Sequence, residues 1–196
     1  MTAFAVSLVV IFIAELGDKS QLMALTFATR FRAVTVLVAI TAATALVHLV
    51  SVLLGAAVGA VLPTGPISIL AGLAFFGFAA WTLRGDELTE DERRQAAAGS
   101  RSAMLAVGGA FLLAELGDKT MLATVTLAAG NPGIGDLTGV WAGSTIGMVA
   151  ADALAIGAGR LLGRRLPDRA IKIGAAVAFA VFGVLLVADG VRVLAG

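Results

Sequence analysis

The sequence contains no cysteine, a single histidine and few charged residues. Without cysteine the chain has no disulfide, no thiolate ligand for a metal and no thiol nucleophile. Charged residues make up only 14% of its 196 residues, whereas about a quarter is usual in a soluble domain. The net charge of +1 gives no electrostatic basis for binding nucleic acid. Together with a hydrophobic content of 59%, enough for about six membrane-spanning helices, these features exclude a soluble enzyme, a disulfide-stapled secreted module and a disordered chain.

The apolar residues are gathered in long runs that end at Arg, Pro or Gly, and the mean hydropathy is +1.00. A helix needs about 20 apolar residues to cross a bilayer. We expect six such helices, over Thr2–Ala28, Ala33–Leu62, Ile67–Leu83, Ser102–Ala129, Leu137–Leu162 and Ala170–Leu194. The first run lacks a basic leader and a small-residue cleavage site, so we do not expect a removable signal peptide. The sequence therefore predicts an all-α integral membrane protein.

Basic residues are distributed very unevenly between the two sides of this six-span arrangement. One side receives Arg30, Arg32, Arg84, Arg93, Arg94, Arg101, Arg160, Arg164, Arg165, Arg169 and Lys172. The other side receives only Arg192. Cytoplasmic loops carry the excess of Lys and Arg. We therefore expect both termini to lie outside the cytoplasm and the central loop, residues 85–101, to lie inside it.

The hexapeptide Ala14-Glu-Leu-Gly-Asp-Lys19 recurs unchanged as Ala114–Lys119. Residues 1–84 and 102–196 therefore read as two three-helix repeats, joined by a linker over residues 85–101. Because three is an odd number, the second repeat must cross the membrane in the opposite sense to the first. Inverted repeats of this kind are typical of secondary transporters, whose binding sites lie near the middle of the bilayer.

Both copies of the motif fall at mid-depth, because Glu15 and Glu115 lie about halfway along their predicted spans. A charged side chain there costs about 3 kcal/mol on insertion scales, so these groups must face each other or water. Together the two copies carry four carboxylates and two lysines, with a net charge of −2. One divalent cation or two protons would cancel that charge, and this equality suggests that the two compete for the same carboxylates.

If the motif is helical, Asp18 and Lys19 lie on the same face as Glu15. Lys19 would then pair with Glu15 at i,i+4 spacing. Thr26 would lie close to the direction of Glu15. The second copy would repeat this arrangement with Thr126. Gly17 allows two interpretations, a local unwinding that frees backbone carbonyls or a close approach of two helices.

The available donors are hard oxygens, which suit Mn²⁺, Ca²⁺ and Mg²⁺ better than Zn²⁺ or Cu⁺. The predicted metal ligands are Glu15, Asp18, Glu115 and Asp118. The predicted supporting residues are Lys19, Ser20, Gln21, Lys119 and Thr120. The metal would be the transported substrate, and we expect no cofactor.

A second polar feature lies on the predicted second and fifth spans. His48 belongs to a stripe with Thr41, Thr44 and Ser51, and the repeat aligns it with Asp152. An ionisable group inside a membrane favours a functional role, and histidine titrates near neutrality. His48 and Asp152 are therefore candidates for a proton relay, while a hydrogen-bonded packing pair is the alternative.

The two motifs, Glu15-Leu-Gly-Asp-Lys-Ser20 and Glu115-Leu-Gly-Asp-Lys-Thr120, fit a signature of the form E-x-G-D-[KR]-[ST] that occurs twice. In this respect the chain resembles the GDT1 (UPF0016) family. The resemblance implies a membrane transporter rather than an enzyme, exchanging Mn²⁺, and in some members Ca²⁺, for protons. It implies that the two acidic motifs form the binding site. With its short central loop, the chain looks like a compact prokaryotic member that exports Mn²⁺ across the inner (plasma) membrane.

Other functions use the same residues. A passive divalent-cation channel could have the same acidic centre, and so could an exporter of an organic cation such as a basic amino acid. An intramembrane hydrolase would need Asp18 and Asp118 to share a proton, but that chemistry leaves the neighbouring lysines and glutamates without a role. Proton counter-movement distinguishes an antiporter from the channel, and stabilisation by metal distinguishes it from the organic-cation exporter.

Overall fold

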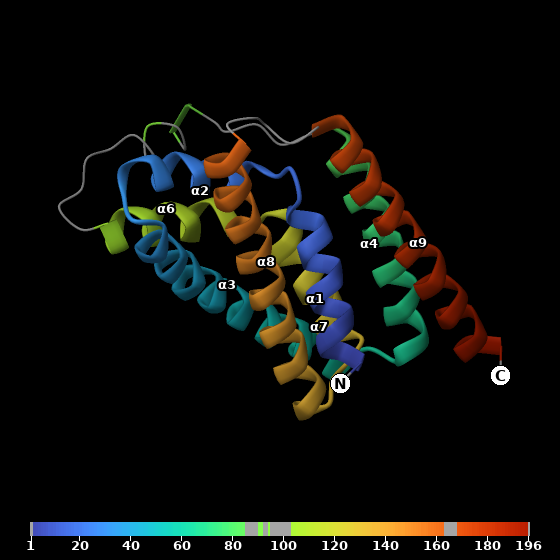
Figure 1. The fold of residues 1–196 in the computed structure, drawn as a ribbon. Coiled ribbons are helices and arrows are strands. Elements are labelled where there is room, and N and C mark those ends of the chain that lie inside the picture. Colours follow the sequence, from blue (N-terminus) through green and yellow to red (C-terminus); the bar gives the residue numbers. More distant parts are fainter. Residues whose placement is uncertain (1, 85–89, 92–93, 95–102, 163–167, 196) are drawn as a thin grey trace.

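The computed structural model describes residues 2–84, 90–91, 94, 103–162 and 168–195. Across these described residues there is no strand, and the chain forms eight helices of eleven residues or more (Figure 1). They are α1 (Thr2–Glu15), α2 (Lys19–Arg30), α3 (Ala33–Val61), α4 (Thr64–Arg84), α6 (Ala103–Glu115), α7 (Lys119–Ala129), α8 (Ile134–Leu162) and α9 (Asp168–Ala195). The predicted all-α class is confirmed.

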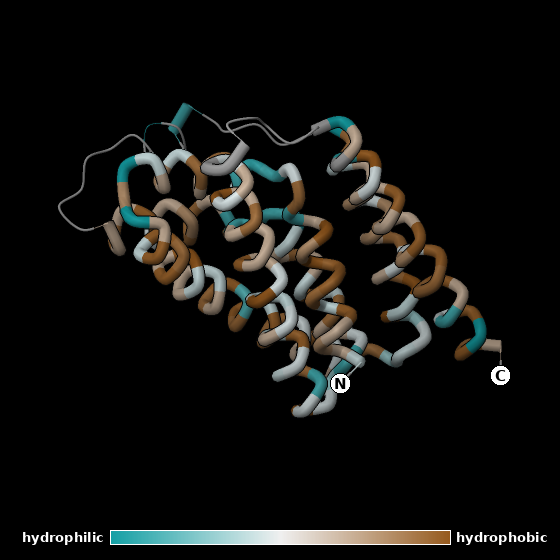
Figure 2. Tube along the Cα trace, in the orientation of Figure 1, coloured by the Kyte–Doolittle hydropathy of each residue, from teal (hydrophilic) through white to brown (hydrophobic). Residues whose placement is uncertain are grey.

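Four helices in the described part of the chain are long and apolar enough to cross a bilayer. These spans are Ala33–Val61, Thr64–Arg84, Ile134–Gly159 and Lys172–Ala195. Figure 2 shows apolar residues along much of these helices, while hydrophilic residues gather mainly at helix ends and turns. The chain is a multi-pass membrane protein. α1 and α6 are apolar as well, but with 14 and 13 residues they are too short to span alone.

The first and fourth predicted spans are each broken into two helices at the motif, so the helical arrangement that would place Asp18 and Lys19 on the face of Glu15 does not form. Gly17 and Gly117 have φ angles of 75° and 81°, a left-handed conformation that glycine adopts at no steric cost. Asp18 and Asp118 follow in extended conformation. Of the two interpretations of the motif glycine, local unwinding is the one found.

The helices pack in pairs that combine the two halves of the chain. α1 lies against α8 and α3 against α6, while α2 contacts α8 and α3 contacts α7. α4 and α9 lie side by side (Figure 1). Glycine permits the closest approaches, because a Cβ at Gly143 would overlap the carbonyl oxygen of Phe4 in α1. A Cβ at Gly55 would likewise overlap the carbonyl oxygen of Val125 in α7.

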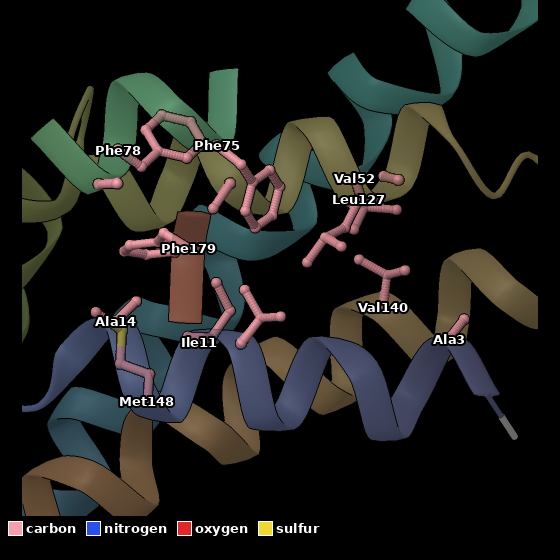
Figure 3. Close-up of a cluster of buried hydrophobic side chains, with 14 of the residues drawn as sticks. Ala3, Ile11, Ala14, Val52, Phe75, Phe78, Leu127, Val140, Met148 and Phe179 are labelled. Carbon is pink, nitrogen blue, oxygen red and sulfur yellow. The ribbon is translucent and has the colours of Figure 1, made fainter. Parts of the chain in front are cut away.

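A cluster of buried apolar side chains joins the α4–α9 pair to the remaining helices (Figure 3). Phe75 of α4 packs edge-on against Phe179 of α9, with ring centroids 5.7 Å apart. Ile11 and Ala14 of α1 belong to the same cluster, as does Met148 of α8. Because Ala14 immediately precedes Glu15, this apolar packing holds the end of α1 at the acidic motif.

Candidate metal centre

The breaks in the two helix pairs bring the acidic residues of each motif together. Glu15 is the last residue of α1 and Glu115 the last of α6, and Lys19 and Lys119 begin the following helices. The backbone N–H of Asp18 donates to the carbonyl of Glu15 at 3.1 Å, and the second copy repeats this turn at 3.2 Å. The aspartate of each motif therefore folds back towards its own glutamate.

The two copies of the motif meet in the interior of the protein. Glu15 is 0% exposed and Glu115 is 2% exposed. One carboxylate oxygen from each of Glu15, Glu115 and Asp118 lies within 4.8 Å of the other two. Three carboxylates converging at this distance form a geometry in which one cation could bind to all three.

Each glutamate has one oxygen with a hydrogen-bond donor and one without. The Ser20 hydroxyl donates to Glu15 Oε2 at 2.5 Å, and the Thr120 hydroxyl donates to Glu115 Oε2 at 3.1 Å. Within the described ranges, Oε1 of Glu15 and Oε1 of Glu115 are buried without a hydrogen-bond partner. A buried oxygen left in this way is costly. These two atoms therefore point to a cation or proton as the missing partner.

The two lysines link the copies by ion pairs that cross between them. Lys119 Nζ lies 2.6 Å from Asp18 Oδ1, and Lys19 Nζ lies 3.7 Å from Asp118 Oδ1. The expectation that Lys19 pairs with Glu15 on one continuous helix was wrong, since the break separates the two residues into different helices. What the sequence spacing missed is that each lysine reaches the aspartate of the opposite motif.

Gln21 links the helix break at Gly17 to the second half of the protein by hydrogen bonds. Its Oε1 accepts the backbone N–H of Gly17 at 2.9 Å, and its Nε2 donates to the carbonyl of Ala151 in α8 at 3.0 Å. At the equivalent position of the second copy, Met121 accepts the N–H of Gly117 on its sulfur at 3.2 Å. A thioether has no hydrogen to donate, so Met121 cannot donate a hydrogen bond to the other half of the protein as Gln21 does.

Asp152 adds a fifth carboxylate to the electrostatics of the centre. It is 0% exposed, and it interacts electrostatically with Glu15 and with Glu115. Neither of its oxygens has a hydrogen-bond partner among the residues that the structure describes. The repeat alignment had singled out Asp152, but only the fold places its buried carboxyl group near the two glutamates.

His48 is buried in α3 beside the fifth predicted span. The Thr145 hydroxyl donates to the carbonyl of Trp141 at 2.7 Å, which leaves its oxygen to accept from Nδ1 of His48 at 3.3 Å. In the predicted polar stripe Thr44 and Ser51 are buried as well. Thr41 is exposed and donates to its own helix instead, so it lies outside the stripe.

The threonines expected near the glutamates also point elsewhere. Thr26 is exposed and donates to the carbonyl of Leu22, and Thr126 donates to that of Leu122. The prediction relied on helical geometry continuing from Glu15 through Thr26. The break at the motif glycine changes the direction of α2 relative to α1, and the same applies to α7 and α6.

Comparison with known proteins gives matches over nearly the whole chain. The family model described as "Divalent cation/proton antiporter GDT1" matches residues 3–90 and 103–193. A Vibrio cholerae protein named "Putative manganese exporter" is 32% identical, with 85% of this chain and 81% of the relative covered. The GDT1-like protein sll0615 of Synechocystis is 29% identical, with 94% and 96% covered.

Longer relatives occur in plants. Protein PAM71 of Arabidopsis thaliana, a chloroplast protein, is 31% identical over 96% of this chain. The match covers 57% of that relative, so this chain spans little more than half of its length. No solved structure matches the chain.

Proposed function

The chain belongs to the GDT1 family of divalent cation/proton antiporters, and from that membership we propose that it exports Mn²⁺ from the cytoplasm in exchange for protons. Members of this family are transporters rather than enzymes, as predicted for this chain. The observation that carries the proposal is the buried group of Glu15, Glu115 and Asp118 oxygens, which the two motif copies supply jointly.

The choice of metal follows from the donors. The converging groups are carboxylates, with the Ser20 and Thr120 hydroxyls beside them, and such oxygens favour Mn²⁺, Ca²⁺ and Mg²⁺. We place Mn²⁺ first because the Vibrio cholerae relative carries the name of a manganese exporter. Ca²⁺ is the second candidate substrate. Asp18 belongs to the same cluster through its ion pair with Lys119.

Proton coupling follows from the charges of this centre. The ion pairs compensate Asp18 and Asp118 with Lys119 and Lys19. Glu15 and Glu115 keep an oxygen without a hydrogen-bond partner among the described residues. A divalent cation compensates two such charges, and so do two protons. The cation and the protons therefore exclude one another, which is what an exchange mechanism requires.

We propose that the chain crosses the membrane six times, as two inverted repeats that alternate between inward-open and outward-open states. In this arrangement α1 with α2 forms the first crossing, and α6 with α7 forms the fourth. The exchange of helix partners between the halves supports it, because α1 packs on α8 as α6 packs on α3. The start of α1 and the end of α9 also lie at the same end of the molecule in Figure 1.

The orientation has a direct test, since the chain contains no native cysteine. In a prokaryotic inner membrane we expect Thr2→Cys to react with a membrane-impermeant thiol reagent added outside. Arg94→Cys should react only after the membrane is opened. The reverse pattern would contradict both termini outside, while leaving the antiport proposal intact.

The proposed exchange can be measured in proteoliposomes that contain a pH-sensitive dye. Mn²⁺ added outside should drive protons out of the vesicles, and Glu15→Gln and Glu115→Gln should each abolish this movement. Asp189→Asn is the control. Asp189 is exposed and accepts a hydrogen bond from the Ser68 hydroxyl, so this variant should behave as wild type. Unchanged exchange in either glutamate variant would contradict the assignment. Mn²⁺ flux without proton movement would support a passive channel instead.

A further inference from the structure

Asp152 lies beside the metal centre but outside the group that converges on the metal position. The three carboxylates whose oxygens lie within 4.8 Å of one another are Glu15, Glu115 and Asp118. Asp152 follows Ala151, whose carbonyl accepts the Gln21 amide of the first motif. Its carboxylate is fully buried and interacts electrostatically with both glutamates. Its carboxyl group therefore lies beside the centre, where the ionised form would add to the negative charge.

Helix α8, which carries Asp152, packs against α1, α2, α3 and α7. The titratable groups of these elements and of the motif breaks that are buried or belong to the ion pairs of the centre are Glu15, Asp18, Lys19, His48, Glu115, Asp118 and Lys119. With Asp152 included, the centre has five carboxylates and two ammonium groups, and thus a net charge of −3 when all are ionised. One divalent cation would leave a charge of −1 inside the membrane.

We propose that Asp152 keeps a proton throughout the transport cycle, including the metal-loaded state, so that one divalent cation exchanges for two protons without leaving a net charge in the centre. This inference rests on the proposed antiport and assigns a role that the motif carboxylates do not have. A buried charge without a counter-charge is strongly unfavourable, and a retained proton removes it.

Asp152 is the carboxylate best suited to keep that proton. An ionised carboxylate can only accept hydrogen bonds, and neither Asp152 oxygen has a donor among the described residues. Glu15 and Glu115, in contrast, each accept a hydroxyl hydrogen bond and face the converging oxygens. The repeat position equivalent to Asp152 is His48, a side chain that is also able to remain uncharged.

The number of protons moved per Mn²⁺ tests this proposal. In proteoliposomes we expect wild type to exchange two protons for each Mn²⁺, at a rate that an imposed membrane potential does not change. Asp152→Asn resembles the protonated acid, so it should retain both the ratio of two and the insensitivity to potential. A wild-type ratio of three that falls to two in this variant would overturn the proposal, since Asp152 would then release its proton. Loss of Mn²⁺ binding in Asp152→Asn would overturn it as well.

The infrared spectrum of Mn²⁺-loaded wild type minus that of Mn²⁺-loaded Asp152→Asn supplies a signal that an inert residue would not give. Comparing the two proteins in the same state is necessary, because a group that keeps its proton cancels between the metal-loaded and metal-free states of one protein. The Mn²⁺-loaded wild type should show the carbonyl stretch of a neutral carboxylic acid, and Asp152→Asn should lack it. Absence of that band from wild type would contradict the retained proton. The band can be recorded even if wild type moves no protons. Such a lack of proton movement would contradict the proposed antiport, while the band would still decide whether Asp152 keeps its proton. If Asp152→Asn fails to fold, Asp152→Glu should keep the band and the ratio of two, and loss of either would count against the proposal.

Discussion

The two copies of the acidic motif have the same chemistry but different supports. Both end a helix at a glutamate, turn through a glycine with positive φ and begin the next helix at a lysine. In the first copy Gln21 ties the turn to α8 of the other half. In the second copy Met121 occupies that position and only accepts the N–H of Gly117. The glutamate that we propose binds the cation is the same in both copies, and the link between the turn and the other half differs.

The ion pairs also differ between the copies. Asp18 is held by Lys119 at 2.6 Å, whereas Asp118 is 3.7 Å from Lys19 and belongs to the group of three converging oxygens. The side chain of Lys119 is 3% exposed and that of Lys19 is 16% exposed. We infer that the aspartate of the first copy mainly stabilises the centre, while that of the second copy mainly binds the cation.

Neutralising each aspartate separately should reveal the difference between the two copies most clearly. Asp118→Asn removes a converging oxygen charge, so Mn²⁺ should bind at least about 100-fold more weakly, beyond the usual effect of an outer partner. Asp18→Asn removes the same formal charge, yet should weaken binding by only about 10-fold, the lower end of the effect of an outer partner. Isothermal titration calorimetry measures both. Equal losses of affinity would show that the two aspartates have the same role.

Replacing the lysines compares the two ion pairs. Lys119→Met leaves Asp18 buried without its close partner and should lower the free energy of unfolding by about 3–5 kcal/mol. Lys19→Met breaks a longer and more exposed pair, so its effect should be smaller. Thermal unfolding in detergent without metal ranks the stabilities of the two variants. A larger loss for Lys19→Met would contradict the importance we give to the 2.6 Å contact.

The turn of the second copy can be tested through its glycine. A Cβ at Gly117 would meet no atom within 4 Å, so Gly117→Ala causes no clash and its cost is conformational. Alanine at positive φ costs about 1–2 kcal/mol. Gly109→Ala is the matched control, because Gly109 lies within α6 and also faces open space. That control should leave stability unchanged or raise it by up to about 1 kcal/mol. If both variants match wild type, the left-handed turn has no energetic role.

The smallest expected effect comes from making the first copy resemble the second. Gln21→Met removes the hydrogen bond to Ala151 and should destabilise the protein by about 1 kcal/mol, while leaving the Mn²⁺ affinity within about 2-fold of wild type. Differential thermal unfolding with and without Mn²⁺ separates the two effects. A large loss of affinity with unchanged stability would instead make Gln21 a direct ligand.

The sequence predicted the helix limits well where charge or proline marks them. The second predicted span, Ala33–Leu62, differs from α3 by one residue, because Arg32 and Pro63 flank it. The breaks at the motif were not predicted as such, since the apolar runs around them have the length and hydropathy of ordinary spans. The glycine of each motif was the available signal, but glycine also occurs at close helix contacts.

The meeting of the two motifs was predicted, but the ion pairs between them were not. Glu15, Glu115 and Asp118 converge as the doubled motif suggested. The cross-copy ion pairs could not be read from spacing, because Lys119 reaches an aspartate 101 positions away in the chain. The same holds for Asp152, whose effect on Glu15 depends on how α8 packs against α1. Such contacts are set by tertiary packing, which local sequence periodicity does not contain.

The most direct test of the account is an anomalous-scattering map from crystals soaked in Mn²⁺. We predict one strong peak bounded by the carboxylates of Glu15, Glu115 and Asp118, and no such peak in crystals of Glu115→Gln. A peak elsewhere with these three carboxylates free of metal would contradict the account. So would a structure in which Glu15 and Glu115 lie too far apart to share one ion.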